Sequence, residues 1–167
     1  MSQTSYNEQG DAQVGMLSDS SIKVTDSFAA EAAVPYGRLV VRGTNRIKEC
    51  KLPAAATDIT NAKNVLGIAM RTQAIEIPLN STSDPEYKAT NTVSVLNFGR
   101  IWVETEDAAT DTTKDVYARH AVAGALNKVG SFSTAAGTGL VKLDNAKWIS
   151  DDKMINNRRM AILEIRL

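Results

Sequence analysis

Residues 98–104 read Phe98-Gly99-Arg100-Ile101-Trp102-Val103-Glu104, a short apolar run with a glycine near its start. Ile101 and Val103 alternate with charged or aromatic neighbours, which is the two-residue period of a strand with one buried face. Similar runs lie at 65–70, at 160–165 and at 37–43, which reads Gly37-Arg38-Leu39-Val40-Val41-Arg42-Gly43. Runs of this length between Gly, Asn, Asp and Ser are typical of an all-β domain.

The composition excludes several classes of protein. The 167 residues fit one domain, which can bury about 70% of its unfolded surface. Lys and Arg total 19, as do Asp and Glu, so the formal net charge is zero. This balance argues against electrostatic binding to nucleic acid or to an anionic membrane. The single cysteine, Cys50, excludes an internal disulfide, and no stretch approaches the ~18 apolar residues of a membrane span. The N-terminus lacks the features of a signal peptide, so we expect synthesis in the cytoplasm.

The strand pattern recurs along most of the chain. Candidate strands lie at 22–24, 39–42, 47–52, 65–70, 74–77, 92–97, 100–105, 116–121, 140–143, 147–149 and 160–166. The alanine-rich segment 26–33 instead predicts a short helix, capped by Asp26 or Ser27 and ended before Pro35. Segment 65–70 is apolar on both sides, which predicts a central strand. Such a set of short strands suits two packed antiparallel sheets or a small barrel.

The N-terminal segment differs from the rest. Residues 1–13 are mostly Ser, Gln, Asn, Gly and Asp, and they cannot bury enough surface to offset their ordering entropy. We therefore divide the chain into an extended N-terminal arm, residues 1–20, and a single β domain, residues 21–167. The arm either orders on a neighbouring subunit or is a frayed terminus. Tyr6, Val14, Met16 and Leu17 are spaced along it as anchors on an arm would be.

Catalytic equipment is hard to find in this sequence. His120 is the lone histidine and lies in a strand pattern, and Cys50 lies at a strand end, so neither suggests a nucleophile with its base. The acidic residues between 104 and 115 lack the spacing of a calcium loop. We predict no catalytic, metal-binding or cofactor-binding residue. Trp102 and Trp148 are expected to be core or interface anchors, or alternatively platforms for stacking sugar rings.

Several segments in order resemble one known family. They are Gly15-Met16-Leu17-Ser18-Asp19, residues 30–44, Val65-Leu66-Gly67-Ile68-Ala69, Val93-Ser94-Val95-Leu96, Gly99-Arg100-Ile101-Trp102-Val103 and Asp115-Val116-Tyr117. Together they resemble the structural cement, or capsid decoration, proteins of tailed bacteriophages over about residues 15–167. One departure is Thr113-Lys114, where the family pattern has a glycine turn. The resemblance implies a jelly-roll-like antiparallel β-sandwich without catalytic residues; a small open β-barrel of the β-tulip type is the alternative.

The resemblance also implies a function. We expect a non-enzymatic virion protein, made in the bacterial host, that binds the exterior of an icosahedral capsid and cements neighbouring major coat protein subunits. Its partners would be the phage major capsid protein and itself, as a homotrimer in preference to a dimer, without nucleic acid or membrane. The expected interface residues are Tyr6, Val14, Met16, Leu17, Tyr36 and Trp102. Two alternatives stay open: a carbohydrate- or receptor-binding module on a virion or cell surface, and a β-sandwich enzyme with a carboxylate pair.

Overall fold

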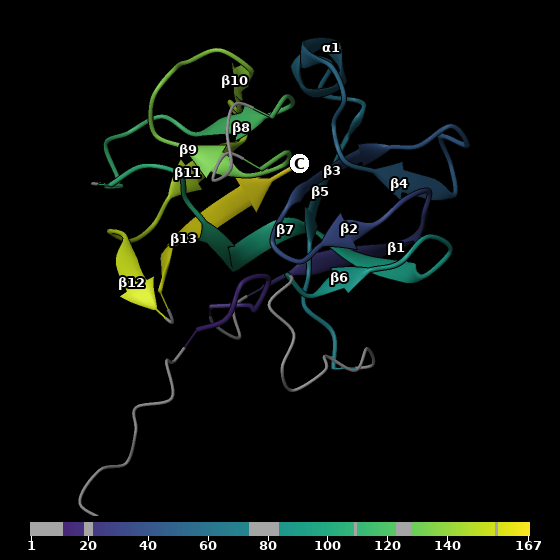
Figure 1. The fold of residues 1–167 in the computed structure, drawn as a ribbon, viewed down its shortest axis with the longest axis horizontal. Coiled ribbons are helices and arrows are strands. Elements are labelled where there is room, and N and C mark those ends of the chain that lie inside the picture. The colour runs from purple at the N-terminus through teal and green to yellow at the C-terminus, as the bar shows by residue number, and fades with distance from the viewer. Residues whose placement is uncertain (1–11, 19–21, 74–83, 109, 123–127, 156) are drawn as a thin grey trace, which may run out of the picture.

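A computed structural model of the chain describes residues 12–18, 22–73, 84–108, 110–122, 128–155 and 157–167. Within these ranges the regular structure is β-strand except for one short helix, α1, so the all-β class is confirmed (Figure 1). In chain order the elements are β1 (Val24–Ala30), β2 (Val34–Pro35), β3 (Leu39–Arg42), β4 (Glu49–Lys51), α1 (Ala56–Thr60), β5 (Val65–Ala69), β6 (Glu86–Tyr87), β7 (Thr92–Glu104), β8 (Tyr117–Arg119), β9 (Phe132–Ser133), β10 (Leu140–Lys142), β11 (Ala146–Trp148), β12 (Lys153–Ile155) and β13 (Arg158–Arg166).

Five strands form a closed ring. The pairings run from β1 to β4, β3, β5 and β7, and β7 returns to β1. The β1–β4 pair is parallel and the other four pairs are antiparallel. Side chains from these strands form a cluster that we call the barrel core. The short β2–β6 pair lies beside it, and the rings of Tyr36 and Tyr87 add to the cluster with their centroids 5.0 Å apart. The barrel core comprises Ala30, Val34, Tyr36, Val40, Cys50, Leu66, Ala69, Tyr87, Val93 and Val95.

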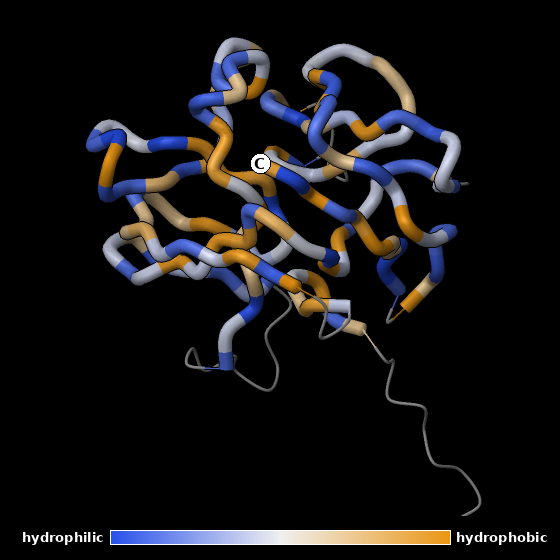
Figure 2. The backbone as a smooth tube through the Cα atoms, turned by 180° about the vertical axis from the view of Figure 1, so that it is seen from behind, coloured by the Kyte–Doolittle hydropathy of each residue, from blue (hydrophilic) through white to orange (hydrophobic). Residues whose placement is uncertain are grey.

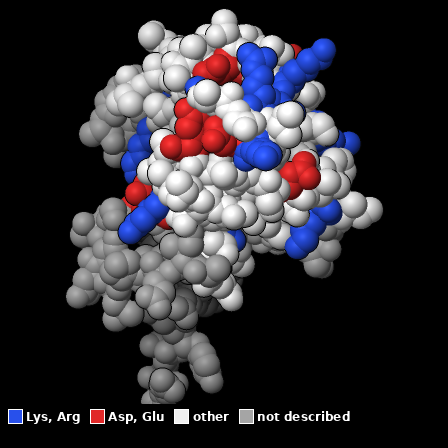
Figure 3. Space-filling view, turned by 90° about the vertical axis from the view of Figure 1, so that its right-hand side faces the viewer, with Lys and Arg blue, Asp and Glu red and all other residues white. Residues whose placement is uncertain are grey.

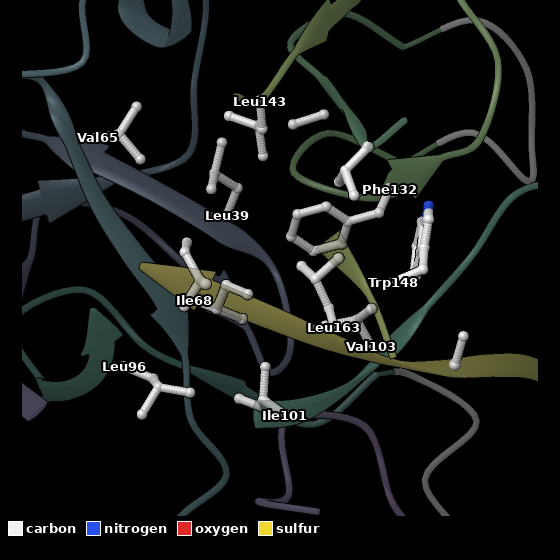
Figure 4. Packing of buried hydrophobic residues seen from close by; sticks show 14 of the residues in the cluster. Leu39, Val65, Ile68, Leu96, Ile101, Val103, Phe132, Leu143, Trp148 and Leu163 are labelled. Atoms are coloured by element: carbon white, nitrogen blue, oxygen red, sulfur yellow. The ribbon is translucent and has the colours of Figure 1, made fainter. Parts of the chain in front are cut away.

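The second half of β7 leaves the ring and carries the same sheet onward as an extension. There β7 pairs with β13, which also pairs with β11 and β12. The three-stranded sheet β10-β8-β9 packs nearby, joined to the end of β7 by a parallel bridge between Thr105 and Phe132. Figure 4 shows the second cluster, here called the sheet core, between these elements and the outer side of the barrel. Its largest members include Leu39, Ile68, Leu96, Ile101, Phe132, Trp148 and Leu163.

Strands β3, β5 and β7 form a wall between the two cores, which is why they bury side chains on both faces. Along β3, Leu39 belongs to the sheet core and Val40 to the barrel core. Along β7, Val95 lies in the barrel core and Leu96 in the sheet core. Hydropathy alternates along several strands, and the connecting loops are mostly hydrophilic (Figure 2). Strand β5 is buried at every position, as expected for the central strand at 65–70.

The detailed architecture differs from the simplest expectation. The pairings do not establish a jelly-roll sandwich. They describe a small closed barrel whose sheet extends beyond the ring along one long strand, β7. This arrangement is nearer to the small-barrel alternative, although the ring is closed and contains one parallel pair. The division of the chain at residue 20 stays a prediction.

Most expected strands are present, although several bounds differ. Strand β3 has the expected bounds and β13 begins two residues earlier than expected, whereas the strand expected at 22–24 shares only Val24 with β1. The two strands expected at 92–97 and 100–105 are one continuous strand, β7. Four short strands, β2, β6, β9 and β12, carry no clear sequence signal because each is two or three residues long. The strand expected at 74–77 lies outside the described residues.

The helix expected at 26–33 is wrong. Residues 24–30 form strand β1, paired with β7 from Val24 to Ala29. An isolated helix of two turns is marginal in water, whereas this strand gains a ladder of hydrogen bonds and buries Ala30. The one helix within the described residues, α1, is a single turn that buries only Ile59. It therefore has no apolar stripe from which the sequence could predict it.

Gly67 in β5 offers a test of the wall between the cores. Its φ is 141°, and a Cβ at this position would lie 2.1 Å from the carbonyl oxygen of Leu96. Because both the backbone conformation and the contact exclude a side chain, Gly67→Ala should destabilise the fold by at least about 2 kcal/mol. The melting temperature should fall by about 4–8 °C or more, measured by calorimetry.

The matched control is Gly137→Ala, where the nearest atom to a Cβ is the flexible Cδ1 of Leu140 at 3.3 Å. We expect its melting temperature to stay close to that of the wild type. Equal effects of the two substitutions would contradict this account of the wall.

Candidate interaction surface

The outer face of the sheet formed by β7 and β13 collects aromatic, apolar and charged side chains. Strand register places Trp102 opposite Ile162, and Phe98 opposite Arg166. These side chains point away from the sheet core because the alternate residues, such as Ile101 and Leu163, are buried in it. Phe98, Trp102 and Ile162 are partly buried, which leaves part of each ring or chain open to contact.

Residues 12–18 fasten to β7 beside this face, and we call them the anchor segment. The Gly15 amide donates to the Trp102 carbonyl at 2.8 Å, and the Trp102 amide donates to the Met16 carbonyl at 2.8 Å. The Arg71 amide donates to the Gly15 carbonyl at 2.7 Å. The anchor segment is therefore a turn with one β-bridge, between Leu17 and Ile101, and backbone hydrogen bonds hold it to two different parts of the fold.

Two glycines let the anchor segment approach so closely. Gly15 has φ +80°, and a Cβ there would lie 2.9 Å from the Arg71 nitrogen. Gly37 has φ +69°, and a Cβ there would lie 2.3 Å from Cγ1 of Val14. Both positions favour glycine for conformation and for space. Val14 and Ala12 then pack with Met160 in a small buried cluster, against which Trp102 also rests.

A ladder of charges crosses the same face. Arg100, Glu164 and Lys147 are cross-strand partners on β7, β13 and β11. The Glu164 carboxylate accepts from Arg100 at 2.8 Å and from Arg166 at 2.6 Å, and Lys147 lies at 3.3 Å. Burial by itself would raise the pKa of Glu164, but these three cations outweigh it and lower the pKa to about 2.

A second charged cluster joins the barrel to the sheet. Asp84 contacts Lys128 at 2.5 Å, Arg158 and, at 3.7 Å, Arg38. Arg38 is buried and also donates to Glu104 at 2.7 Å. Burial alone would raise the pKa of Asp84, yet hydrogen bonds from Lys128 and Arg158 lower it. This cluster connects the residue before β3 with the end of β7 and the start of β13, so it stabilises the fold.

The expected interface residues fall into three groups. Tyr6 lies outside the described residues. Val14 and Tyr36 are buried inside this chain, at 8% and 2% exposure, and burial raises the pKa of the Tyr36 hydroxyl. Met16 is 42% exposed, while Leu17 and Trp102 are partly buried against the core clusters. Their roles at an interface stay predictions, and Met16 and Trp102 are the best placed of them.

Exposed apolar residues that sequence reasoning missed lie near the middle of β7. Ile22 is 81% exposed, Val24 is 50% exposed and Leu167 is 44% exposed. The Leu167 amide donates to the Asn97 carbonyl at 2.9 Å, and Val24 is the register partner of Phe98. Single apolar residues near strand ends carry no distinctive signal in a sequence, so only the pairing brings them together.

The residues considered for chemistry are placed in structural roles. Trp148 is 1% exposed, and its indole Nε1 donates to the Asp115 carbonyl at 3.1 Å, so it offers no stacking platform for sugars. Cys50 is buried in the barrel core, which raises the pKa of its thiol to about 11. Within the described ranges no group of three or more His, Cys, Asp or Glu side chains is arranged to hold a metal ion. In that part of the chain, no helix has the length and hydropathy needed to cross a membrane.

The pKa of Glu164 generates a prediction about acid stability. Its folded-state pKa, about 2, lies below the ordinary 4.5, so its ion pairs stabilise the fold above about pH 5 and lose effect as pH falls toward 2. Glu164→Gln should therefore lower the free energy of unfolding at pH 7 by up to about 3 kcal/mol. Urea unfolding across this range should show the two proteins converging as pH falls. A difference that stays constant from pH 7 to pH 2.5 would contradict the assignment.

Comparison with known proteins agrees with this structural picture. The chain is similar in fold to a chain from a structure described as "The capsid of Myoviridae Phage XM1", with a TM-score of 0.69, 17% identity and coverage of 99% of this chain and 97% of that one. No curated protein matches. The family model described as "Structural cement protein (E217 gp24/Pam3 gp6)" matches residues 2–166. Because that model spans nearly the whole sequence, the chain belongs to the phage structural cement protein family and is a capsid-associated structural protein.

Proposed function

We propose that this protein binds the outer surface of an icosahedral phage capsid and cements neighbouring major coat protein subunits, so that the expanded shell is stabilised. Family membership supports a structural role in the capsid. The structural observation that carries the proposal is the anchor segment, which holds residues 12–18 of the N-terminal arm beside Trp102 and leaves Met16 exposed. A fixed departure point lets the body sit on one subunit while the arm reaches another.

The thermodynamics of such binding require little from each copy. A protein that binds the expanded shell, and not free coat subunits, stabilises that shell by mass action. A typical contact buries about 800 Å² per partner. Once the body is bound, the contact of the arm is intramolecular, and its effective concentration adds to the overall affinity. Many copies on one closed lattice then act together.

The surface charges suit a protein partner. Figure 3 shows one face of the molecule, where basic and acidic side chains are interspersed among uncharged ones. The chain as a whole has zero formal charge. Nucleic acid binding needs clustered positive charge, so a coat protein surface is the better match. Partly buried Trp102 and exposed Met16 supply the apolar contacts that such interfaces favour.

The shell-binding function has a direct test. The purified protein is sedimented with cognate coat shells before and after expansion, and bound protein is quantified. We expect saturable binding at fixed stoichiometry to expanded shells, little binding to unexpanded ones, and a higher melting temperature of the expanded shell. Absence of binding to both forms would contradict the proposed function.

The arm is tested separately by deleting residues 2–11. This deletion spares Ala12 and Val14, which pack in the buried cluster with Met160, so thermal unfolding of the free protein should change little. Shell affinity should fall at least tenfold, because the intramolecular contact of the arm is lost. The control is a full-length chain in which residues 2–11 are scrambled, and it should bind as weakly as the deletion. Unaltered affinity of the deletion variant would leave the arm without a role in cementing.

A further inference from the structure

The turn between β3 and β4 is a basic projection from the barrel. Together with Lys63 and Glu31, to which it is hydrogen-bonded, we call residues 42–51 the basic turn. It carries five Lys or Arg side chains and two carboxylates, which give a net charge of +3. The turn lies on the right-hand side of Figure 1, the side that faces the viewer in Figure 3. Its cations are Arg42, Arg46, Lys48, Lys51 and Lys63, and its carboxylates are Glu31 and Glu49.

Positive charge is concentrated in this part of the chain. Residues 22–73 contain eight Lys and Arg against four Asp and Glu, whereas the described residues from 84 to 167 contain eleven of each. Every ion pair formed among the described residues uses cations outside the basic turn. Cations that their own chain does not pair create a positive potential that attracts an acidic partner.

The two carboxylates of the basic turn are engaged by its backbone. Glu31 accepts from the Thr44 amide at 2.8 Å and from its hydroxyl at 3.0 Å. Glu49 accepts from the Asn45 amide at 2.9 Å. The bonds from Thr44, with a smaller effect of Lys51, lower the pKa of Glu31, so this carboxylate stays ionised while it holds the turn. The carboxylates therefore shape the turn and leave its exposed cations available.

Further hydrogen bonds fix the conformation of the basic turn. Arg42 donates from Nε to the Lys63 carbonyl at 2.9 Å and from Nη1 to the Arg46 carbonyl at 2.6 Å. The side-chain oxygen of Asn45 accepts from the amides two and three residues later, both at 3.3 Å. A loop that is already held in one conformation loses little entropy on binding, so the turn is preorganised for contact.

An apolar side chain stands among these cations. Ile47 is 81% exposed and lies between Arg46 and Lys48 in the sequence. The basic turn has no Phe, Tyr or Trp on which a nucleic acid base could stack, and one isoleucine is too little to hold a membrane. Protein interfaces, by contrast, combine an apolar centre with a charged rim of complementary sign. The partner that matches is an acidic protein surface with an apolar depression.

We propose that the basic turn docks on an acidic surface of the major coat protein, with Ile47 seated in an apolar depression of that surface. This inference rests on the proposed function, because it names a part of this chain that contacts the shell. Complementary charge steers the approach of the two proteins and fixes the register of the contact. The isoleucine adds a contact that salt does not screen.

A coat protein fits this description better than a second copy of the chain. Two basic turns facing each other would bring like charges together, which costs free energy. The described residues from 84 to 167 offer no surplus of carboxylates, and six of these are held by cations of their own chain. Those six are Asp84, Glu104, Glu106, Asp115, Asp152 and Glu164.

Charge reversal at two exposed positions tests the docking directly. The double variant Arg46→Glu/Lys48→Glu keeps the hydrogen bonds of the turn, because at these two residues the bonds come from the backbone. Co-sedimentation of the full-length protein with expanded shells, at about 0.1 M salt, should show an affinity at least tenfold below that of the wild type. Added salt should weaken wild-type binding and affect the variant less.

The matched control is Lys114→Glu/Lys153→Glu, which makes the same change of charge at two exposed lysines outside the basic turn. It should bind shells as the wild type does, and circular dichroism checks the fold of each variant. Ile47→Ser tests the apolar contact and should lower the affinity severalfold without changing its salt dependence. Its own control is Met154→Ser, at a residue that is 60% exposed and lies outside the turn.

Each alternative partner gives a distinct result. Shell binding by Arg46→Glu/Lys48→Glu that equals that of the wild type, or of a control that falls equally, would overturn the inference and leave the proposed function standing. Salt-sensitive binding of a single-stranded DNA oligonucleotide that the variant loses would overturn it in favour of nucleic acid. Self-association that only the variant loses, measured by sedimentation velocity, would overturn it in favour of a second copy. Absence of wild-type binding to shells would count against the proposed function and remove this inference with it.

Discussion

Backbone hydrogen bonding on both sides of β7 is the constraint on which the rest of the structure depends. The strand is 13 residues long, and its first half closes the barrel between β5 and β1. Its second half lies between β13 and the anchor segment. Gly99, at φ 137°, lies where the strand passes from one environment to the other. The strand thereby fixes the barrel, the extension of its sheet and the anchor segment relative to one another.

The parts of the fold that were predictable are those whose signal is local. Alternation around Ile101 and apolarity on both sides of 65–70 each reflect what one strand buries, and both agree with the structure. Segment 26–33 shows the opposite case. Its alanines favour a helix locally, but pairing with a strand more than sixty residues later decides its conformation. The two strands expected at 92–97 and 100–105 are a single strand, and Gly99 lies inside it.

The candidate site was less accessible for the same reason. Val14 and Tyr36 looked like outward anchors, yet Gly15 and Gly37 bring the two backbones together and bury both side chains in their own chain. The ladder of Arg100, Glu164 and Lys147 depends on the register of three strands. Register between strands far apart in the sequence cannot be predicted from a local pattern. Family membership, by contrast, was recognisable, because it rests on the order of many weak segments along the chain.

The dependence of the anchor segment on β13 has a consequence for biosynthesis. Residues 12–18 emerge early from the ribosome, but their partner Trp102 is made much later, and Met160 later still. Until β13 is complete, the cluster that holds Ala12 and Val14 cannot form. A nascent or truncated chain therefore lacks a properly seated N-terminal segment. The N-terminal segment is thus among the first parts of the chain to be made and among the last to reach its final packing.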